Sequence, residues 1–154
     1  GLQRLLAAAQ RPWNERNSLK ELSDFFTWFR EHFPYYRGAC DGCSLEKTKF
    51  LGLVRPTSRE SEEGGASVSE LYSCAECANR TTLFPRFRTV PPVLRSRRGR
   101  CGEYSWMTVR ILEALGFPAR WVDNHAGHVW AETQVAGRWV HVDPCEAAVD
   151  NPLM

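Results

Sequence analysis

Four of the six cysteines in this 154-residue chain stand in two tight pairs, Cys40-x-x-Cys43 and Cys74-x-x-Cys77. Two such pairs supply the four thiolates that tetrahedral zinc takes, and a filled shell of protein ligands leaves no open position for chemistry. We therefore expect one structural zinc ion, in a zinc-binding subdomain at about residues 35–85. The stretch between the two pairs does not have to bind the metal and is free to vary.

Other interpretations of these cysteines depend on the compartment. Six cysteines in a secreted chain could form three disulfides in any of 15 connectivities. However, no apolar run approaches the ~20 residues that span a bilayer, and "LLAAA" at residues 5–9 is too short for a signal-peptide core. We expect a reducing compartment, where paired cysteines favour a metal site. Reduced buried thiols are one alternative. A thioredoxin-like redox pair is another, but it would need a C-x-x-C between a strand and a helix.

Length and composition predict one globular domain. Hydrophobic residues make up 43% of the chain and charged residues 25%, as in ordinary soluble domains. The net charge of +2 gives no indication of a nucleic-acid or membrane partner.

Helices are expected at residues 2–10 and 18–32, the second capped by Asn17 or Ser18 and ended by Pro34. Residues 55–70 are polar and contain glycine, so they predict a mobile loop. Pro85, Pro91 and Pro92 predict an extended stretch after it.

The pattern changes at Cys101. Apolar residues recur at helical spacing as far as Leu115, and Gly116 is a helix stop. Three runs typical of strands follow, at residues 119–122, 128–135 and 138–143. A helix followed by a sheet predicts an α+β fold, with this part at about residues 95–154 and a helical part at 1–34.

Cys101 lies between two glycines within the arginine-rich "RRGRCGE" and begins the predicted helix. Free backbone N–H groups, the helix dipole and nearby arginines all favour a thiolate there, and the thiolate is the nucleophilic form. A solvated arginine run at a helix start is the alternative.

The last two predicted strands offer a base for this nucleophile. If Ala136-Gly137 is a two-residue hairpin turn, His128 and Asp143 share one face of the hairpin and lie within reach of each other. A register slip of one residue would separate them. Together with Cys101 they form a Cys-His-Asp set suited to nucleophilic acyl transfer. His125 and His141 are rival bases, Asp123 is a rival acid, and Cys145 is interpreted as a packing thiol.

Three motifs, "GRCGE", "HVWAE" and "WVHVDPCE", follow two cysteine pairs in this order and closely resemble those of the cytoplasmic peptide:N-glycanases. The similarity runs from "FFTWF" at residue 25 to the end of the chain and includes "LFPRF". These enzymes belong to the transglutaminase-like, papain-related group and remove N-linked glycans from misfolded glycoproteins. The resemblance implies a single catalytic core domain over residues 1–154, shorter at the C-terminus than the family, whose members continue past "NPLM" into further strands.

The resemblance also implies roles for individual residues. Cys101 matches the nucleophile, His128 the general base and Asp143 its orienting acid, and Trp28 matches an indole of the oxyanion hole. Tyr104 stands where the family usually has tryptophan, at a position expected on the rim of the cleft. The cleft that receives the two proximal sugars is matched by Arg120, Trp130, Glu132, Trp139 and Glu146, and the zinc ligands by Cys40, Cys43, Cys74 and Cys77.

The implied activity is hydrolysis of the asparagine side-chain amide, with a ubiquitin-receptor shuttle protein and the proteasome as implied partners. A transglutaminase or a cysteine protease on the same fold is one alternative. A crosslinking enzyme would need a channel for an amine, and a protease would need subsites along a peptide backbone. The other alternative is a non-catalytic interaction module, against which an intact Cys-His-Asp set argues.

Overall fold

The computed structural model describes residues 15–152, so the helix expected at residues 2–10 lies outside the described residues. The described chain forms two compact units. The helix–sheet unit comprises residues 15–35 and 99–152, and the cysteine unit comprises residues 36–98. The chain passes between them at Tyr35 and Gly99, which form an isolated parallel bridge. Within residues 15–152, no helix is long and apolar enough to cross a membrane.

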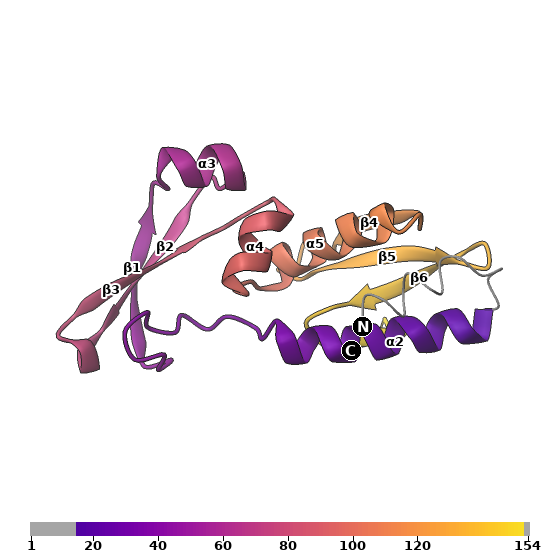
Figure 1. The fold of residues 1–154 in the computed structure, drawn as a ribbon, viewed down its shortest axis with the longest axis horizontal. Helices are drawn as coiled ribbons and strands as arrows, with labels where there is room; N and C mark the ends of the chain where they lie inside the picture. Colours follow the sequence, from indigo (N-terminus) through magenta and orange to yellow (C-terminus); the bar gives the residue numbers. More distant parts are fainter. Residues whose placement is uncertain (1–14, 153–154) are drawn as a thin grey trace. The chain divides into compact units, whose positions relative to one another are not determined.

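The helix–sheet unit contains two helices and a four-stranded antiparallel sheet of order β4-β5-β6-β7 (Figure 1). Helix α5 packs against β4 and β5, and α2 contacts β7 and β5. This arrangement confirms the α+β prediction and all three predicted strands. The elements are α2 Glu15–His32, α5 Cys101–Ala114, β4 Ala119–Asp123, β5 Val129–Val135, β6 Arg138–Asp143 and β7 Ala148–Val149.

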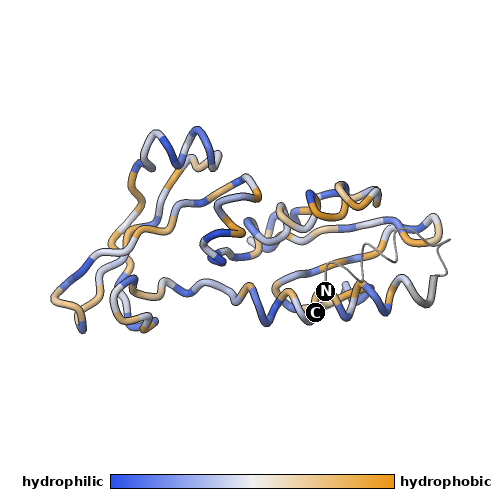
Figure 2. Tube along the Cα trace, viewed as in Figure 1, coloured by the Kyte–Doolittle hydropathy of each residue, from blue (hydrophilic) through white to orange (hydrophobic). Residues whose placement is uncertain are grey.

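The core of this unit is aromatic on the helices and aliphatic on the sheet. Apolar and polar residues alternate along α2 (Figure 2), which gives the helix one apolar stripe. The largest buried side chains from the helices are Leu22, Phe25, Phe26, Phe29, Tyr104, Met107 and Leu112, and those from the sheet are Val135, Val140 and Val142.

Helix α2 begins earlier than the sequence predicts. Because α2 starts at Glu15, Asn17 and Ser18 lie inside it, and neither is its N-cap. The side chain of Ser18 is buried, which shows that the residue serves the packed interior rather than the helix end.

The rim position expected for Tyr104 is also wrong. Its side chain is 0% exposed, and its hydroxyl donates to the backbone carbonyl of Pro34 at 2.8 Å. The rings of Phe29 and Phe33 meet it edge-on. A Cβ on Gly99 would lie 2.5 Å from the Tyr104 ring, so glycine is required there for this close approach.

The cysteine unit is built on a three-stranded antiparallel sheet of order β1-β2-β3. Tyr36, Tyr72 and Phe84 form a small core cluster on it. The elements are β1 Thr48–Val54, α3 Ser58–Gly64, β2 Ser69–Cys74, the short 3-10 helix η1 Ala75–Cys77, β3 Arg80–Pro85 and α4 Val90–Ser96.

Two expectations for this unit are wrong. The region expected to be a mobile loop holds α3, because Thr57 and Glu60 form a capping box in which each side chain accepts the other's backbone N–H. The stretch expected to be extended holds α4, since its prolines occupy the first turn, where no N–H is needed.

Candidate functional site

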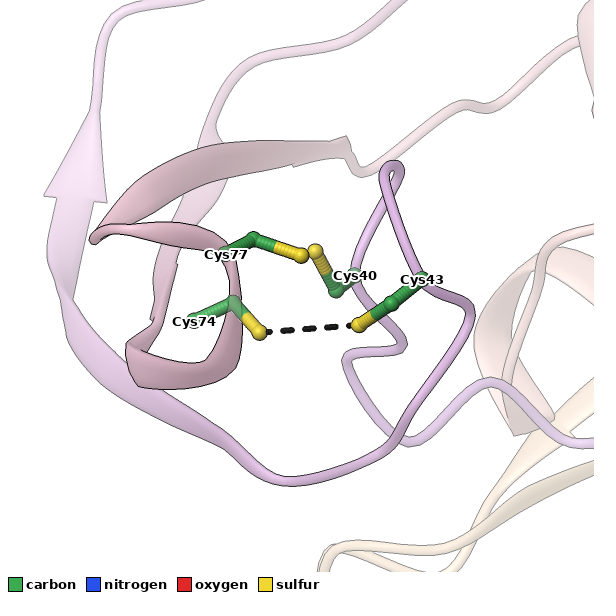
Figure 3. A group of neighbouring side chains, drawn as sticks. All are labelled: Cys40, Cys43, Cys74 and Cys77. Carbon is green, nitrogen blue, oxygen red and sulfur yellow. Dashed lines mark hydrogen bonds between the residues drawn. The ribbon is translucent and has the colours of Figure 1, made fainter.

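The four paired cysteines converge in the cysteine unit (Figure 3). Their sulfur atoms all lie within 4.8 Å of one another, and the Cys43 and Cys74 sulfurs are 3.7 Å apart. Four thiolates at ~2.3 Å around a tetrahedral ion would have sulfurs ~3.8 Å apart, so a small contraction closes the shell. None of the six cysteines forms a disulfide. The four thiols can therefore hold one metal ion.

Local hydrogen bonds make the four thiols unequal. The backbone amides of Gly42 and Cys43 lower the pKa of the Cys40 thiol to about 6. In contrast, the Cys43 thiol and burial raise the pKa of Cys77 to about 12, and burial raises the pKa of Cys74. The Cys40 thiolate thus forms more readily than the other three. Binding of a metal ion would require these thiols to lose their protons.

The second cluster lies in the helix–sheet unit, on the hairpin of β5 and β6. Strand pairing places Val135 opposite Arg138 and Glu132 opposite His141, which confirms the register expected from the sequence. The Nε2 atom of His128 lies 2.6 Å from Oδ2 of Asp143. Since a carboxylate can only accept, Nε2 carries the proton and Nδ1 remains as the basic nitrogen.

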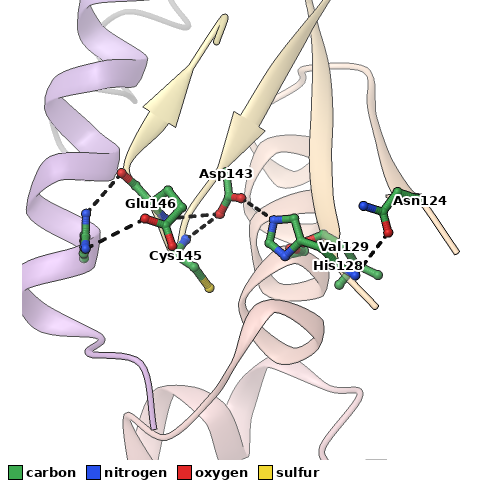
Figure 4. Close-up of polar contacts among 8 residues, drawn as sticks. Asn124, His128, Val129, Asp143, Cys145 and Glu146 are labelled. Carbon is green, nitrogen blue, oxygen red and sulfur yellow. Dashed lines mark hydrogen bonds and ion pairs between the residues drawn. The ribbon is translucent and has the colours of Figure 1, made fainter. Parts of the chain in front are cut away.

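Asp143 is held in place from its other side. Its carboxylate lies between the His128 ring and the backbone of Cys145 (Figure 4). Oδ1 accepts the N–H of Cys145 at 2.9 Å and that of Glu146 at 3.2 Å, and the side chain is only 2% exposed. A buried carboxylate with three donors has little freedom to move, so it fixes the orientation of the imidazole.

Cys101 is the first residue of α5 and is half-buried. Ser105, one helical turn later on the same side, donates its hydroxyl to the carbonyl of Val129 at 3.1 Å, next to His128. This bond holds the first turn of α5 against the start of β5. Burial, followed by the charges of Asp143 and Cys101, raises the pKa of Cys145 far above its ordinary value. Cys101 therefore lies in the same neighbourhood as Asp143 and Cys145.

Four of the five residues matched to a sugar-binding cleft lie on β4, β5 and β6, where they make two separate sets of contacts. Arg120 pairs with Glu132 at 2.7 Å across β4 and β5, and its guanidinium lies 4.1 Å from the Trp139 ring centroid. The second set of contacts is made by Trp130. Its ring stacks on that of His128, with centroids 5.9 Å apart, and contacts that of His141, with centroids 5.6 Å apart. The Trp130 Nε1 atom is buried without a hydrogen-bond partner.

The two remaining expected site residues are positioned by α2. Trp28 is half-buried and stacks on His32, with ring centroids 4.5 Å apart. Glu146 is exposed, and its carbonyl accepts from Arg30 at 3.2 Å. The stack of Trp28 on His32 does not involve the His128–Asp143 pair, whereas the backbone N–H of Glu146 donates to Oδ1 of Asp143 at 3.2 Å.

The rival residues have other partners. Asp123 accepts the N–H of His125 at 2.7 Å within an exposed turn. His125 is exposed, with a φ of 58°, as suits a turn residue. His141 is half-buried, and burial lowers its pKa. The histidine paired with a carboxylate at this site is His128.

Sequence reasoning missed two polar residues beside this pair. Ser105 ties α5 to β5, and Oδ1 of Asn124 accepts the N–H of His128 at 3.1 Å (Figure 4). The spacing of four residues between Cys101 and Ser105 was a usable signal, because it places both on one helix face. Asn124 stands in a turn-forming sequence, "DNHAG", where asparagine commonly caps the backbone.

Comparison with known proteins gives a family match. Residues 52–144 match the family model of the transglutaminase-like superfamily. The chain is 38% identical to a peptide-N(4)-(N-acetyl-beta-glucosaminyl)asparagine amidase of Caenorhabditis elegans, over 96% of this chain and 24% of the relative. It is 37% identical to the Saccharomyces cerevisiae amidase of the same name, over 85% of this chain and 35% of the relative. The chain thus spans about a quarter to a third of the length of these relatives.

Proposed function

This chain belongs to the transglutaminase-like superfamily, and from that premise we propose that it is the catalytic core of a peptide:N-glycanase. The reaction is hydrolysis of the side-chain amide of a glycosylated asparagine, which releases the intact glycan and leaves aspartate. The observation that carries the proposal is the 2.6 Å contact between His128 and buried Asp143, beside the helix that begins at Cys101. The relatives' printed name, which specifies an asparagine amidase, supports the choice of substrate.

In the proposed reaction, Cys101 attacks the substrate, His128 transfers protons and Asp143 orients His128. Nδ1 of His128 accepts the thiol proton, and the Cys101 sulfur attacks the amide carbonyl carbon. Collapse of the tetrahedral intermediate breaks the carbon–nitrogen bond, and the proton passes from His128 to the departing glycosylamine. Water, deprotonated by His128, then hydrolyses the thioester to aspartate and restores the thiol. Asp143 keeps the imidazole in the required tautomer through both steps.

Trp28 is proposed as a donor to the oxyanion, since an indole N–H is suited to that task. The stack on His32 restricts the ring and reduces the entropy lost on forming such a bond. This role rests on the resemblance of "FFTWF" to the family and on the position of the residue on α2.

The sugar-binding role is proposed for Arg120, Trp130, Glu132, Trp139 and Glu146. Aromatic faces and carboxylates next to a His–Asp pair suit the apolar face and the hydroxyl groups of a sugar. The unpartnered Nε1 of Trp130 offers one further donor.

The metal is proposed to be one structural zinc ion held by Cys40, Cys43, Cys74 and Cys77. Four sulfur donors with no carboxylate or imidazole favour zinc over harder ions. The ion would hold the two cysteine pairs together and take no part in the reaction. The thiols must stay reduced to bind it, which favours a reducing compartment such as the cytoplasm.

Denatured, misfolded glycoproteins are proposed as substrates. A folded surface would obstruct the approach of an asparagine side chain to a half-buried thiol. A ubiquitin-receptor shuttle protein and the proteasome stay proposed partners on the resemblance alone.

The test is to incubate the chain with a denatured N-glycoprotein in water enriched in oxygen-18. We expect an intact glycan with both proximal sugars, and aspartate carrying the label at the former attachment site. A Cys101→Ala variant is the matched negative control, because it removes only the attacking atom. Backbone cleavage would identify a protease instead, and joining of glutamine to lysine a crosslinking enzyme. Release that leaves one sugar on asparagine would identify a glycosidase and contradict the assignment of Cys101.

A further inference from the structure

A four-cysteine cluster that holds a divalent metal ion has an excess of negative charge. A divalent ion with four thiolates carries a net charge of −2. Backbone donors reduce part of this charge, as where the Gly42 N–H approaches the Cys40 sulfur at 3.3 Å. A nearby cation would stabilise the loaded cluster further.

Arg80 provides such a cation. A Cβ built on Gly42, inside the first cysteine pair, would stand 3.1 Å from the Arg80 Cδ and 3.4 Å from its Nε. The same point lies 3.3 Å from the sulfur of Cys77. The guanidinium stem therefore passes over the backbone of the first pair, next to a ligand from the second.

The register of β3 fixes this approach. Arg80 pairs with Cys74 and Thr82 with Tyr72, so Arg80 and Thr82 share one face of β3. The Thr82 hydroxyl accepts the N–H of Asp41 at 3.0 Å. This bond ties the first cysteine pair to β3 and so places Gly42 beneath the Arg80 side chain.

Other charges near the first pair do not compete for Arg80. Asp41 is already paired, 2.6 Å from Arg98. Across residues 15–152, no carboxylate forms an ion pair with Arg80. Its charge is thus available to the cluster.

We propose that Arg80 is the counter-charge of the metal-loaded cysteine cluster, stabilising the four thiolates across Gly42 and slowing loss of the ion. The proposal rests on the proposed zinc site but not on the proposed catalytic activity. Arg80 is a positioning and charge-balancing residue in this scheme, and it is not a ligand.

The test measures zinc release from the full chain to a chromophoric chelator. We expect Arg80→Gln to lose zinc about three- to tenfold faster than the unsubstituted chain at low ionic strength, as suits one exposed charge near a dianion. Arg80→Lys should restore most of the retention. Arg55→Gln is the matched control, because Arg55 is an exposed arginine beyond the opposite end of β1 and should leave the rate unchanged.

Salt separates an electrostatic role from a structural one. Because the Debye length falls from ~30 Å at 0.01 M to ~3 Å at 1 M, the difference between Arg80→Gln and the unsubstituted chain should shrink sharply at 1 M. Equal release rates at low salt would overturn the proposal. So would faster release that neither salt nor lysine changes, since that result assigns Arg80 to packing. A chain that binds no zinc at all would refute the metal site itself, whatever Arg80 does.

Discussion

At the scale of single residues, Asp143 sets the orientation and the tautomer of the His128 ring. It accepts one hydrogen bond from the His128 ring and two from the backbone that follows. The carboxylate can only accept, so it selects the tautomer with Nδ1 free. We expect Asp143→Asn to lower kcat about 10⁴-fold, because an amide N–H in this position favours the opposite tautomer. Single-turnover kinetics with a denatured glycopeptide measures the loss. Near-normal turnover would show that Asp143 does not orient the base.

Cys101 and Cys145 are neighbouring thiols that differ in burial, since Cys101 is half-buried and Cys145 is buried. Cys145 is 8% exposed, and burial raises its pKa, so it stays a protonated packing group. We expect iodoacetamide to label Cys101 and leave Cys145 unmodified, as peptide mass spectrometry can show. Cys101→Ala should abolish turnover, whereas Cys145→Ala should change it by about twofold or less. Activity that survives loss of Cys101 and disappears with Cys145 would reverse the assignment.

We expect His141 to make the free energy of unfolding depend on pH. Burial lowers its pKa in the folded chain below the ordinary value of 6.5, so the unfolded chain binds this proton first as the pH falls. Stability should therefore decrease as the pH falls below about 6.5, until the folded-state pKa is passed. His141→Gln removes this titration, and urea unfolding between pH 7 and 5 should give it a smaller decrease than the unsubstituted chain. Identical slopes for the two proteins would contradict the prediction.

At the scale of elements, the turn between β5 and β6 sets the register that joins His128 to Asp143. Ala136 and Gly137 both have positive φ, 50° and 81°, as a type I′ turn requires. The space around the Gly137 Cα is open, so Gly137→Ala should cost about 1 kcal/mol through backbone strain alone. Ala136→Asn, which supplies the preferred Asn-Gly turn, should stabilise the hairpin. Thermal unfolding should then give Gly137→Ala a lower melting temperature than the unsubstituted chain, and Ala136→Asn a higher one. A higher melting temperature for Gly137→Ala and a lower one for Ala136→Asn would rule out this turn type.

At the scale of the whole molecule, the metal is expected to hold only one of the two units together. The core cluster of the cysteine unit is small, so we expect closure of residues 36–98 to depend on a bound metal ion. Removing zinc with a chelator under reducing conditions should unfold this unit, seen as a loss of strand signal in circular dichroism.

The aromatic residues allow the two units to be followed separately. All six tryptophans lie outside residues 36–98, so tryptophan fluorescence does not report directly on the cysteine unit. We expect that fluorescence to change less than the tyrosine signal from Tyr36 and Tyr72. A well-folded, metal-free chain with reduced thiols would contradict the structural role of the metal.

Periodicity and turn chemistry were sufficient to predict much of the helix–sheet unit. The alternation in β5 and β6, with Ala136-Gly137 between them, predicts that His128 and Asp143 share one face. The observed pairing of β5 with β6 has the predicted register at every paired residue. The start of α5 at Cys101 also follows from its local sequence. Local sequence signals failed to predict α3 and α4, where composition and helix-start signals pointed to different structures. Polar composition hid the capping box of α3, and the prolines of α4 suggested an extended chain although they occupy a helix start.

By itself, the sequence determined the cysteine spacing, the parity of the hairpin and the position of the thiol at a helix start, because each depends on neighbours within a few residues. Only the tertiary structure decided which distant groups meet. It buries Tyr104 against Phe29 and Pro34, joins Ser105 to Val129 and places Arg80 over Gly42. These contacts depend on how helices and strands pack to fill space, and no local pattern encodes the distance between residues seventy positions apart.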